Sequence, residues 1–324
     1  MRKDYFINLF EKYKYEPAII YNNRKSSYKD LKKKIELNIS LVKDFGVLSG
    51  DVIAIEGDFS PNSISLLFSL INCNCIIVPI NKNANNDLTH LYEISKVQYV
   101  LRIDNNDKIK PKKLSERVGN IYYDNLRDKN LPGLVLFSSG TSGEPKVAVH
   151  NFSALLEKFM VRRKSLRTIN FLLFDHWGGL NTMFHILSNK GVLISLIDRS
   201  PENVCRLIQD NKVELLPVSP TFLNLLLVTK LYKKFNLNSL KVISYGTEPM
   251  PKTTLKHLNL IFPNVKLVQT YGLIELGVLH SKSKSQDSLW MKVGGDGYQT
   301  RIVDGILQIK AKSAMLGYLN AKSP

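Results

Sequence analysis

The sequence predicts an α/β fold with largely parallel sheets, to which a small β-rich piece is appended. Short apolar runs rich in β-branched residues alternate with longer segments whose apolar residues recur every three to four positions. This alternation is typical of strands and helices that follow one another in α/β proteins. Residues 290–312 differ, because short strand-like runs are separated there by glycines. That pattern favours a small, barrel-like β unit.

The spacing of apolar residues predicts a helix at residues 29–45. Leu31, Ile35 and Ile39 lie on about one helical face, and Gly46 and Gly50 mark the end of the segment. Strands are predicted where short apolar runs end at turn residues. In chain order, the predicted elements are strand 52–56, helix 63–71, strand 75–80, strand 133–137, helix 153–162, helix 201–210, strand 213–218, helix 221–231, strand 241–244 and strand 265–269.

Composition excludes several classes of protein. The chain has 324 residues, of which 44% are hydrophobic and 23% charged, which is ordinary for a globular protein with one large or two medium domains. Its most apolar run, residues 63–80, is interrupted by Asn72 and Asn74, and the N-terminus has charges throughout. We therefore expect no membrane span, no secretory signal and a cytoplasmic location.

Cysteine content and charge narrow the choice further. An odd number of cysteines argues against a disulfide framework, and a strand would place Cys73 and Cys75 on opposite faces rather than in one metal site. The net charge of +17 suggests nucleic acid as a partner. However, the lysines are spread along the whole chain without an organised patch. We therefore predict no nucleic-acid partner.

The segment after the strand at 133–137 has the composition of a phosphate-binding loop. Glycines let backbone N–H groups approach a polyanion, hydroxyls add donors, and a lysine adds a point charge. It is not a Walker loop, because Glu144 and Pro145 stand between the second glycine and the lysine. An ordinary solvated loop is the alternative. The predicted binding residues are Ser138, Ser139, Gly140, Thr141, Ser142, Gly143 and Lys146.

The order of these residues resembles the signature of the adenylate-forming superfamily, which includes acyl- and aryl-CoA ligases, luciferases and peptide-synthetase adenylation domains. Residues 27–31, 46–52 and 72–79 resemble further segments of that family. The resemblance implies that this chain corresponds to the large N-terminal domain of such an enzyme. This would comprise two doubly wound α/β subdomains, at about 1–133 and 134–268, with the adenine motif and β-rich piece at 269–324. The loop would then hold the β- and γ-phosphates of ATP, and Lys146 is one of two catalytic candidates.

A second motif follows at residues 269–275. It resembles the family's Tyr-Gly-x-Thr/Ser-Glu, which implies that Tyr271 packs against adenine, as suits a flat aromatic face. Gln269 and Gly272 belong to the same cofactor site, and Glu275 would hold Mg²⁺ together with Thr141. A strand end with an ordinary surface glutamate is the alternative. Ile274 departs from the pattern, since it cannot donate the hydrogen bond that a hydroxyl would give to the α-phosphate.

Two further segments would shape the acid site. The stretch Tyr245, Gly246, Thr247 and Glu248 resembles the loop that borders both adenine and the acid; Gly246, Thr247 and Glu248 are assigned to the cofactor, and Tyr245 and Gly246 to the substrate.

Residues 174–182 combine two family patterns. The dipeptide Phe174-Asp175 resembles the Phe-Asp pattern of adenylation domains that activate amino acids. The longer His-x-Gly-Gly-Leu match resembles CoA ligases and implies that His176, the second catalytic candidate, lies beside the carboxylate. Trp177 would line the pocket or the core.

The resemblance therefore implies ATP-dependent activation of a carboxylic acid as an acyl-adenylate, with transfer to the thiol of coenzyme A or carrier-protein pantetheine. In complete family members a ribose-binding aspartate and a mobile C-terminal domain with a catalytic lysine follow the Met-x-Gly-Tyr-x-Asn segment, which resembles residues 315–320 here. We expect this chain to lack that lid domain and to require it as a separate partner. A weakly catalytic binding protein and an amino-acid-activating domain are the alternatives.

Overall fold

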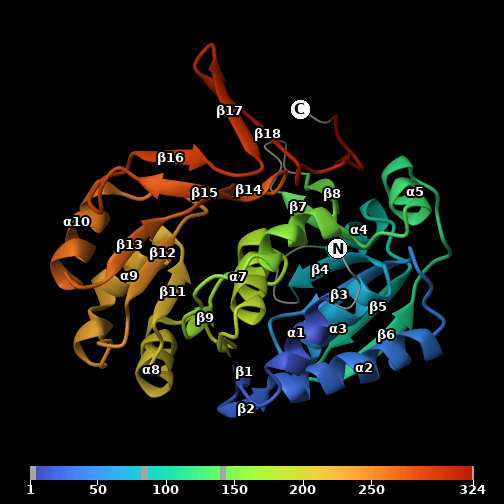
Figure 1. Ribbon diagram of the computed structural model, residues 1–324, viewed down its shortest axis with the longest axis horizontal. Coiled ribbons are helices and arrows are strands. Elements are labelled where there is room, and N and C mark those ends of the chain that lie inside the picture. The colour runs from blue at the N-terminus through green and yellow to red at the C-terminus, as the bar shows by residue number, and fades with distance from the viewer. Residues whose placement is uncertain (1–4, 82–86, 139–143, 323–324) are drawn as a thin grey trace.

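The computed structural model describes residues 5–81, 87–138 and 144–322. Figure 1 shows two sheet-containing halves with α7 (Trp177–Ser188) between them and a long hairpin projecting from one end. Helices and mainly parallel strands alternate through both halves, which confirms the predicted α/β fold. Within the described part of the chain, no helix is long and apolar enough to cross a membrane.

One sheet occupies the half that holds the described N-terminus. Its centre is parallel, while β6, β8 and β19 run antiparallel to their neighbours. In spatial order, its described strands are β19 (Gly317–Tyr318), β8 (Lys146–Asn151), β7 (Gly133–Ser138), β4 (Ile76–Asn81), β3 (Val52–Gly57), β5 (Tyr99–Ile103) and β6 (Ile109–Lys113). The helices of this half are α1 (Tyr5–Lys12), α2 (Tyr28–Asp44), α3 (Pro61–Asn72), α4 (Leu88–Ile94) and α5 (Ile121–Asp128).

The second sheet is parallel except for its edge strand β2. In spatial order, its described strands are β13 (Lys266–Gln269), β12 (Val242–Tyr245), β11 (Leu215–Val218), β9 (Thr168–Asn170), β10 (Leu193–Ser195), β1 (Pro17–Tyr21) and β2 (Arg24–Ser27). The helical elements of this half are α8 (Pro201–Asn211), α9 (Pro220–Thr229), η2 (Leu231–Lys233) and α10 (Lys252–Ile261).

The two sheets exchange segments across the boundary predicted at 133/134. β1 pairs with β10 of the second sheet, although it lies near the N-terminus. Conversely, β7 pairs with β4 and β8 pairs with β7, so both belong to the first sheet. A division of the chain at residue 133 therefore does not separate the sheets, because strand pairing follows long-range contacts rather than sequence order.

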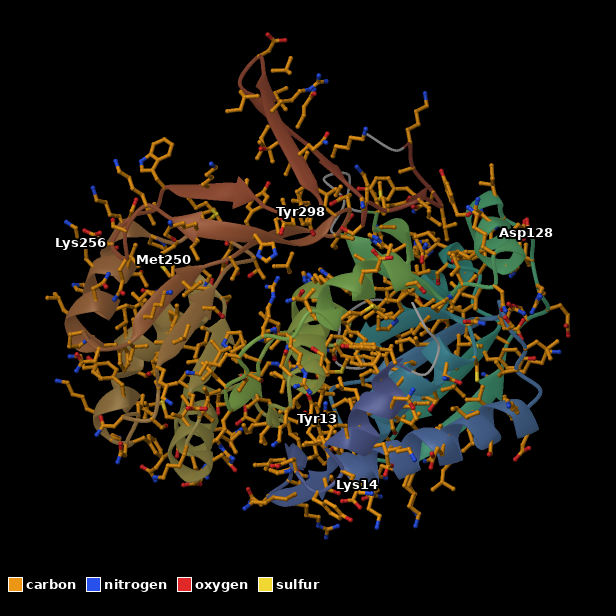
Figure 2. All side chains as sticks on the ribbon, in the orientation of Figure 1. Tyr13, Lys14, Asp128, Met250, Lys256 and Tyr298 are labelled. Carbon is orange, nitrogen blue, oxygen red and sulfur yellow. The ribbon has the colours of Figure 1, made fainter. Side chains whose placement is uncertain are left out.

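The β-rich C-terminal piece is present and consists of two small sheets. β14 (Tyr271–Leu273), β15 (Gly277–Ser283) and β16 (Met291–Gly294) form one, and β17 (Tyr298–Val303) and β18 (Ile306–Ala311) form the projecting hairpin in Figure 1. The described strands of this piece thus do not close into a single barrel. At the base of the hairpin, the Tyr298 hydroxyl lies 3.5 Å from the carbonyl of Val278, which ties the hairpin to β15 (Figure 2).

Most predicted helices and strands are confirmed with small shifts at their ends. The predicted helix 29–45 is α2, whose Ser27 and Asp30 form a capping box that satisfies backbone donors at its start. The predicted helix 153–162 differs, because α6 (Phe152–Leu156) gives way to the 3₁₀ helix η1 (Glu157–Met160). The tighter turn buries Phe159 in the core shared with α7.

Candidate functional site

The stem of the predicted phosphate loop is a strand pair. β7 and β8 run antiparallel, and Ser138 lies directly opposite Lys146 as the last pair of the ladder. This register holds the two ends of the loop side by side. Both residues are half-buried. The predicted residues Ser139, Gly140, Thr141, Ser142 and Gly143 lie outside the described part of the chain.

Three residues from distant parts of the sequence meet beside this stem. The Tyr318 hydroxyl donates a hydrogen bond to Glu275 Oε1, and Lys146 Nζ lies 5.6 Å from the centre of the Tyr318 ring. Burial and the neighbouring Glu275 carboxylate raise the pKa of the Tyr318 hydroxyl, so the phenol keeps its proton and donates. The structure thus brings the predicted phosphate ligand Lys146 and the predicted metal ligand Glu275 to one tyrosine.

A short C-terminal segment fixes this arrangement. β19 pairs with β8, and the Met315 backbone N–H donates to the Glu275 carbonyl at 2.7 Å. The Asn320 side chain accepts from the Val147 N–H at 3.0 Å and donates to the Pro145 carbonyl at 2.8 Å. The sequence alone indicated no role for Tyr318 or Asn320. Their Met-x-Gly-Tyr-x-Asn pattern was the available signal, but it could not show that the segment returns to β8.

The predicted adenine motif lies at the carboxyl end of β13 and in the β14–β15 hairpin. Gln269 ends β13, Tyr271 and Gly272 begin β14, and Glu275 lies in the turn before Gly277. The Gln269 Oε1 atom is buried and has no hydrogen-bond partner among the described residues. An amide oxygen in this state fits an amino group such as that of adenine. Tyr271 is half-buried and Gly272 is exposed.

The segment after β12 crosses the motif closely. A Cβ atom at Gly246 would lie 2.8 Å from the Thr270 carbonyl oxygen, so only glycine lets the two backbones approach in this way. Thr247 has a φ of 73°, which is strained for a β-branched residue and is common at ligand-binding turns. Backbone geometry at both positions therefore suits a ligand lying close to the chain.

The flanking residues of that segment have structural partners. Tyr245 is buried in the core of the second sheet, so its phenol does not face an open acid site as the sequence suggested. The Glu248 carboxylate accepts from the Thr221 N–H at 2.7 Å, at the start of α9. Burial opposes ionisation of Glu248, but hydrogen bonds from Thr221 and Ser219 leave its pKa lowered.

The predicted acid-site residues lie at the N-terminus of α7. His176 precedes the helix and is exposed, whereas Trp177 is buried, with an indole Nε1 that lacks a partner among the described residues. The indole packs against the Glu275 turn, since a Cβ at Gly277 would lie 2.8 Å from its Nε1. Asp175 accepts from the Asn81 N–H at 3.4 Å. Burial raises the pKa of Asp175. α7 thus brings the predicted acid site next to the adenine motif.

The residues present fit a magnesium–nucleotide complex better than a protein-only metal site. No cluster of three or more His, Cys, Asp or Glu side chains that could hold a metal occurs in the described ranges. Glu275 offers a single carboxylate close to Lys146. This suits Mg²⁺, which is typically bound through one or two carboxylates together with substrate phosphates.

Solved structures share this architecture. The N-terminal subdomain of Klebsiella oxytoca NpsA in complex with 3-hydroxyanthranilyl-AMSN superimposes with a TM-score of 0.77 at 15% identity, over 98% of this chain and 88% of that one. The anthranilate CoA ligase AuaEII in complex with anthranoyl-AMP gives a TM-score of 0.79 at 16% identity, over 98% and 70% of the two chains. Both have the fold of the N-terminal domain of adenylate-forming enzymes.

Fold and loop stem together define an α/β domain of the adenylate-forming class. Residues 8–305 match the family described as AMP-binding enzyme, and the chain belongs to that family. Among its relatives, 4-coumarate–CoA ligase-like 9 of Arabidopsis thaliana is 24% identical over 77% of this chain and 50% of its own length. D-alanine–D-alanyl carrier protein ligase of Staphylococcus epidermidis is 23% identical over 93% of this chain and 67% of its own.

These relatives place the chain in a ligase-type enzyme family whose members carry out acid adenylation. The chain spans about half the length of the first of them, and 12% of a plipastatin synthase polypeptide of Bacillus subtilis.

Proposed function

We propose that this chain binds ATP and a carboxylic acid and activates the acid as an acyl-adenylate. A carboxylate oxygen attacks the α-phosphorus, the bond to the bridging oxygen breaks, and pyrophosphate leaves with its electron pair. A thiol, from coenzyme A or a carrier-protein pantetheine, then attacks the acyl carbon and releases AMP. The convergence of Lys146, Tyr318 and Glu275 at the loop stem is the observation that carries this proposal.

Each residue has a role that follows from its chemistry. Lys146 supplies a point charge to the β- and γ-phosphates, and Tyr318 limits where its ammonium can lie. Tyr271 and Gln269 hold adenine, the first by its aromatic face and the second through its unpartnered oxygen. His176, exposed at the start of α7, donates to the acid carboxylate. Mg²⁺, held by Glu275 and Thr141, would neutralise charge on the phosphates when bound.

The first test removes the charge of Lys146. Lys146→Met keeps the aliphatic stem but loses a charge-assisted contact typically worth about 1.5–3 kcal/mol, so ATP affinity should fall roughly 10- to 100-fold. Titration calorimetry with Mg·ATP measures this. Lys256→Met, on the exposed face of α10 (Figure 2), is the matched control and should bind as the unmodified chain does. Equal affinity in the two variants would contradict the proposed site.

A second candidate is a nucleotide- or acyl-AMP-binding protein with little turnover. Ile274 favours it, because no hydroxyl stands where the family pattern has one. Acid-dependent exchange of pyrophosphate into ATP separates the candidates. Exchange with aryl or aliphatic acids supports the ligase, whereas ATP binding without exchange supports the binding protein. If a C-terminal domain supplied as a separate partner restores exchange, the chain is one half of the enzyme.

An amino-acid-activating domain is the third candidate, and Asp175 favours it. Its Oδ1 is buried without a hydrogen-bond partner in the described part of the chain, which would suit a substrate ammonium. Exchange that requires an α-amino acid and is lost in Asp175→Asn would support this candidate over a simple carboxylic acid.

A further inference from the structure

A small cleft beside the predicted acid site is lined by basic groups. It lies between η1, α7 and β15 and has a volume of about 100 Å³. Pockets for whole ligands are typically about 300–1,000 Å³, so this space suits a single ionised group. The polar and charged side chains that line it are Lys158, Arg163, Asn181, His185, Asn189 and His280.

The positive charge in this cleft is not neutralised by its own lining. None of the described residues that line it is an aspartate or glutamate. Lys158 Nζ contacts the Val278 carbonyl at 3.3 Å and lies 5.5 Å from the Trp177 ring centre. Arg163 Nη2 lies 3.2 Å from His280 Nε2. The half-buried Lys158 thus has only neutral partners here, and the exposed Arg163 adds a second positive charge at the edge of the cleft. A charge in a partly desolvated space normally requires a counter-charge.

Burial and the charge of Arg163 disfavour protonation of the other three basic groups in the cleft. Burial, followed by repulsion from Arg163, lowers the pKa of Lys158 to about 7. Burial and the same guanidinium lower the pKa values of His185 and His280. An anion in the cleft would reverse this repulsion and favour the charged lysine. The carboxylates of Glu157 and Asp296, with Lys312, face an adjoining cleft that shares Lys158 and His280.

Helix α7 connects the cleft with the predicted acid site. Trp177, Asn181 and His185 are spaced four residues apart, so they follow one another along one helical face. At 1.5 Å per residue, the stripe runs about 12 Å from the His176 end to His185. The Asn181 Oδ1 atom is buried without a partner among the described residues, and rotation of the amide presents its NH₂ group instead.

We propose that this cleft binds an oxyanion, and that the anion is a second carboxylate at the far end of the acid that the chain activates. The second part rests on the proposed function, with the reacting carboxylate at His176. Lys158 and Arg163 supply charge, and Asn181 supplies a directional donor. The start of α7 lies roughly 6–12 Å along the helix from Asn181 and His185, at 1.5 Å per residue. The substrate class is thus a dicarboxylic acid whose two carboxylates are separated by roughly one aromatic ring or a six- to eight-carbon chain.

Binding of inorganic sulfate tests the cleft directly. Calorimetry on the full chain at pH 6.5 should detect sulfate binding that weakens at least tenfold in Lys158→Met and persists in Lys158→Arg and in the control Lys256→Met. Binding should also weaken as the pH rises through about 7, because Lys158 then loses its proton. Thermal unfolding of each variant verifies that it is folded. Sulfate affinity that is absent, or indifferent to Lys158, overturns the proposal.

A pair of acids of matched shape tests the source of the anion. In the presence of Mg·ATP, benzene-1,4-dicarboxylate should bind at least tenfold more tightly than 4-methylbenzoate, and Lys158→Met should abolish that preference. Lys158-dependent sulfate binding without preference for the diacid would overturn the link to the acid and identify a free-anion site. If the chain binds Mg·ATP and 4-methylbenzoate but not sulfate, this inference is overturned and the proposed function stands. If it binds sulfate at Lys158 but neither Mg·ATP nor 4-methylbenzoate, the proposed function is overturned.

Discussion

At the scale of single residues, the turn between β14 and β15 combines a chemical role with a packing role. Glu275 faces Tyr318 in this turn, while Ile274 is partly buried against the main core. A threonine there would offer a hydroxyl to a phosphate but bury less apolar surface. Under the proposed function, Ile274 therefore stabilises the turn and forgoes one contact with the nucleotide.

Replacement of Ile274 measures this balance. Under the proposed function, the hydroxyl of Ile274→Thr contacts the α-phosphate, and Mg·ATP affinity should rise about tenfold or more, as a hydrogen bond to a charged group contributes about 1.5 kcal/mol or more. The lost apolar contact should lower the free energy of unfolding by about 1 kcal/mol. Ile274→Val is the control, since it has the shape of threonine without the hydroxyl. Equal ATP affinity of the two variants would show that this position does not contact the nucleotide.

His150 should make stability depend on pH. It lies buried in β8, and burial lowers its pKa to about 4, against 6.5 for a free histidine; Glu275 opposes this only in part. The contribution of neutral His150 to the free energy of unfolding is complete above pH 6.5 and is lost as the pH falls towards 4, because the histidine binds a proton more readily in the unfolded chain than in the folded one. The loss amounts to about 3 kcal/mol.

Denaturant unfolding between pH 7 and 5 measures this slope. His150→Gln, which does not titrate, should flatten it, and the remainder should come from His185 and His280, whose pKa values are also lowered. The exposed His176→Gln is the control and should keep the full slope. An unchanged slope in His150→Gln would mean that His150 is not the titrating group.

Motif residues and packing residues differed in how far the sequence predicted them. Ser138, Lys146 and Glu275 were predicted as site residues from their motifs, and the structure brings them together at the stem of the loop. Lys158 was not predicted, because a single lysine in a helical segment has no local signature. Tyr245 was predicted to face the substrate but is buried, since the alternation of side chains in β12 turns it into the core.

At the scale of elements, the loops after β3 and β10 join the two sheets. Arg199 donates to both Asp58 carboxylate oxygens, at 2.7 and 3.1 Å, and to the Phe171 carbonyl at 2.7 Å. Both side chains of the ion pair are largely buried. Next to them, Ser195 donates to the Phe59 carbonyl. This bidentate pair therefore fixes the approach of the two sheets near the start of α8.

Breaking the Asp58–Arg199 pair should destabilise the fold. Arg199→Met keeps the aliphatic stem but leaves Asp58 partly buried and unpaired, which should lower the free energy of unfolding by about 2–3 kcal/mol. A double-mutant cycle with Asp58→Asn should give a coupling energy of about 1–3 kcal/mol. Glu11→Gln breaks the surface pairs of Glu11 with Lys14 and Lys32 and should leave stability nearly unchanged. Additive effects at 58 and 199 would exclude a direct contribution from the pair.

Helices and strands could be predicted from local sequence patterns, but the pairing of strands that lie far apart in the sequence could not. The helices predicted at 29–45 and 63–71 from their apolar periodicity are α2 and α3, which begin one and two residues earlier because Ser27 and Ser60 cap them. The pairing of β1 with β10 joins residues more than 170 positions apart, for instance Ile19 with Leu193. No local pattern encodes that partner, and the approximate boundary at residue 133 that the family resemblance implied therefore did not include this pairing.

At the scale of the whole molecule, one apolar core belongs to both sheets. It joins Ile53 and Leu134 of the first sheet to Ile19 and Leu193 of the second, with α7 between them. Phe184 of α7 is fully buried, and its ring lies 5.3–5.7 Å from four other phenylalanine rings. The second sheet has a further core on its other face. Because the shared core contacts both sheets, neither sheet should hold its structure without the other.

Phe184→Ala tests this cooperativity. Removal of a fully buried phenylalanine should lower the free energy of unfolding by about 3–5 kcal/mol. Native-state hydrogen exchange should show that reduction equally for the slowest amides of β3 and of β12, because both exchange through the same global opening. Val228→Ala, at an exposed position of α9, should leave both unchanged. If β12 kept its protection while β3 lost it, the sheets would unfold independently. The shared core would then be an interface between two separately stable units, and the acid site at the start of α7, which lies between them, could open without unfolding either one.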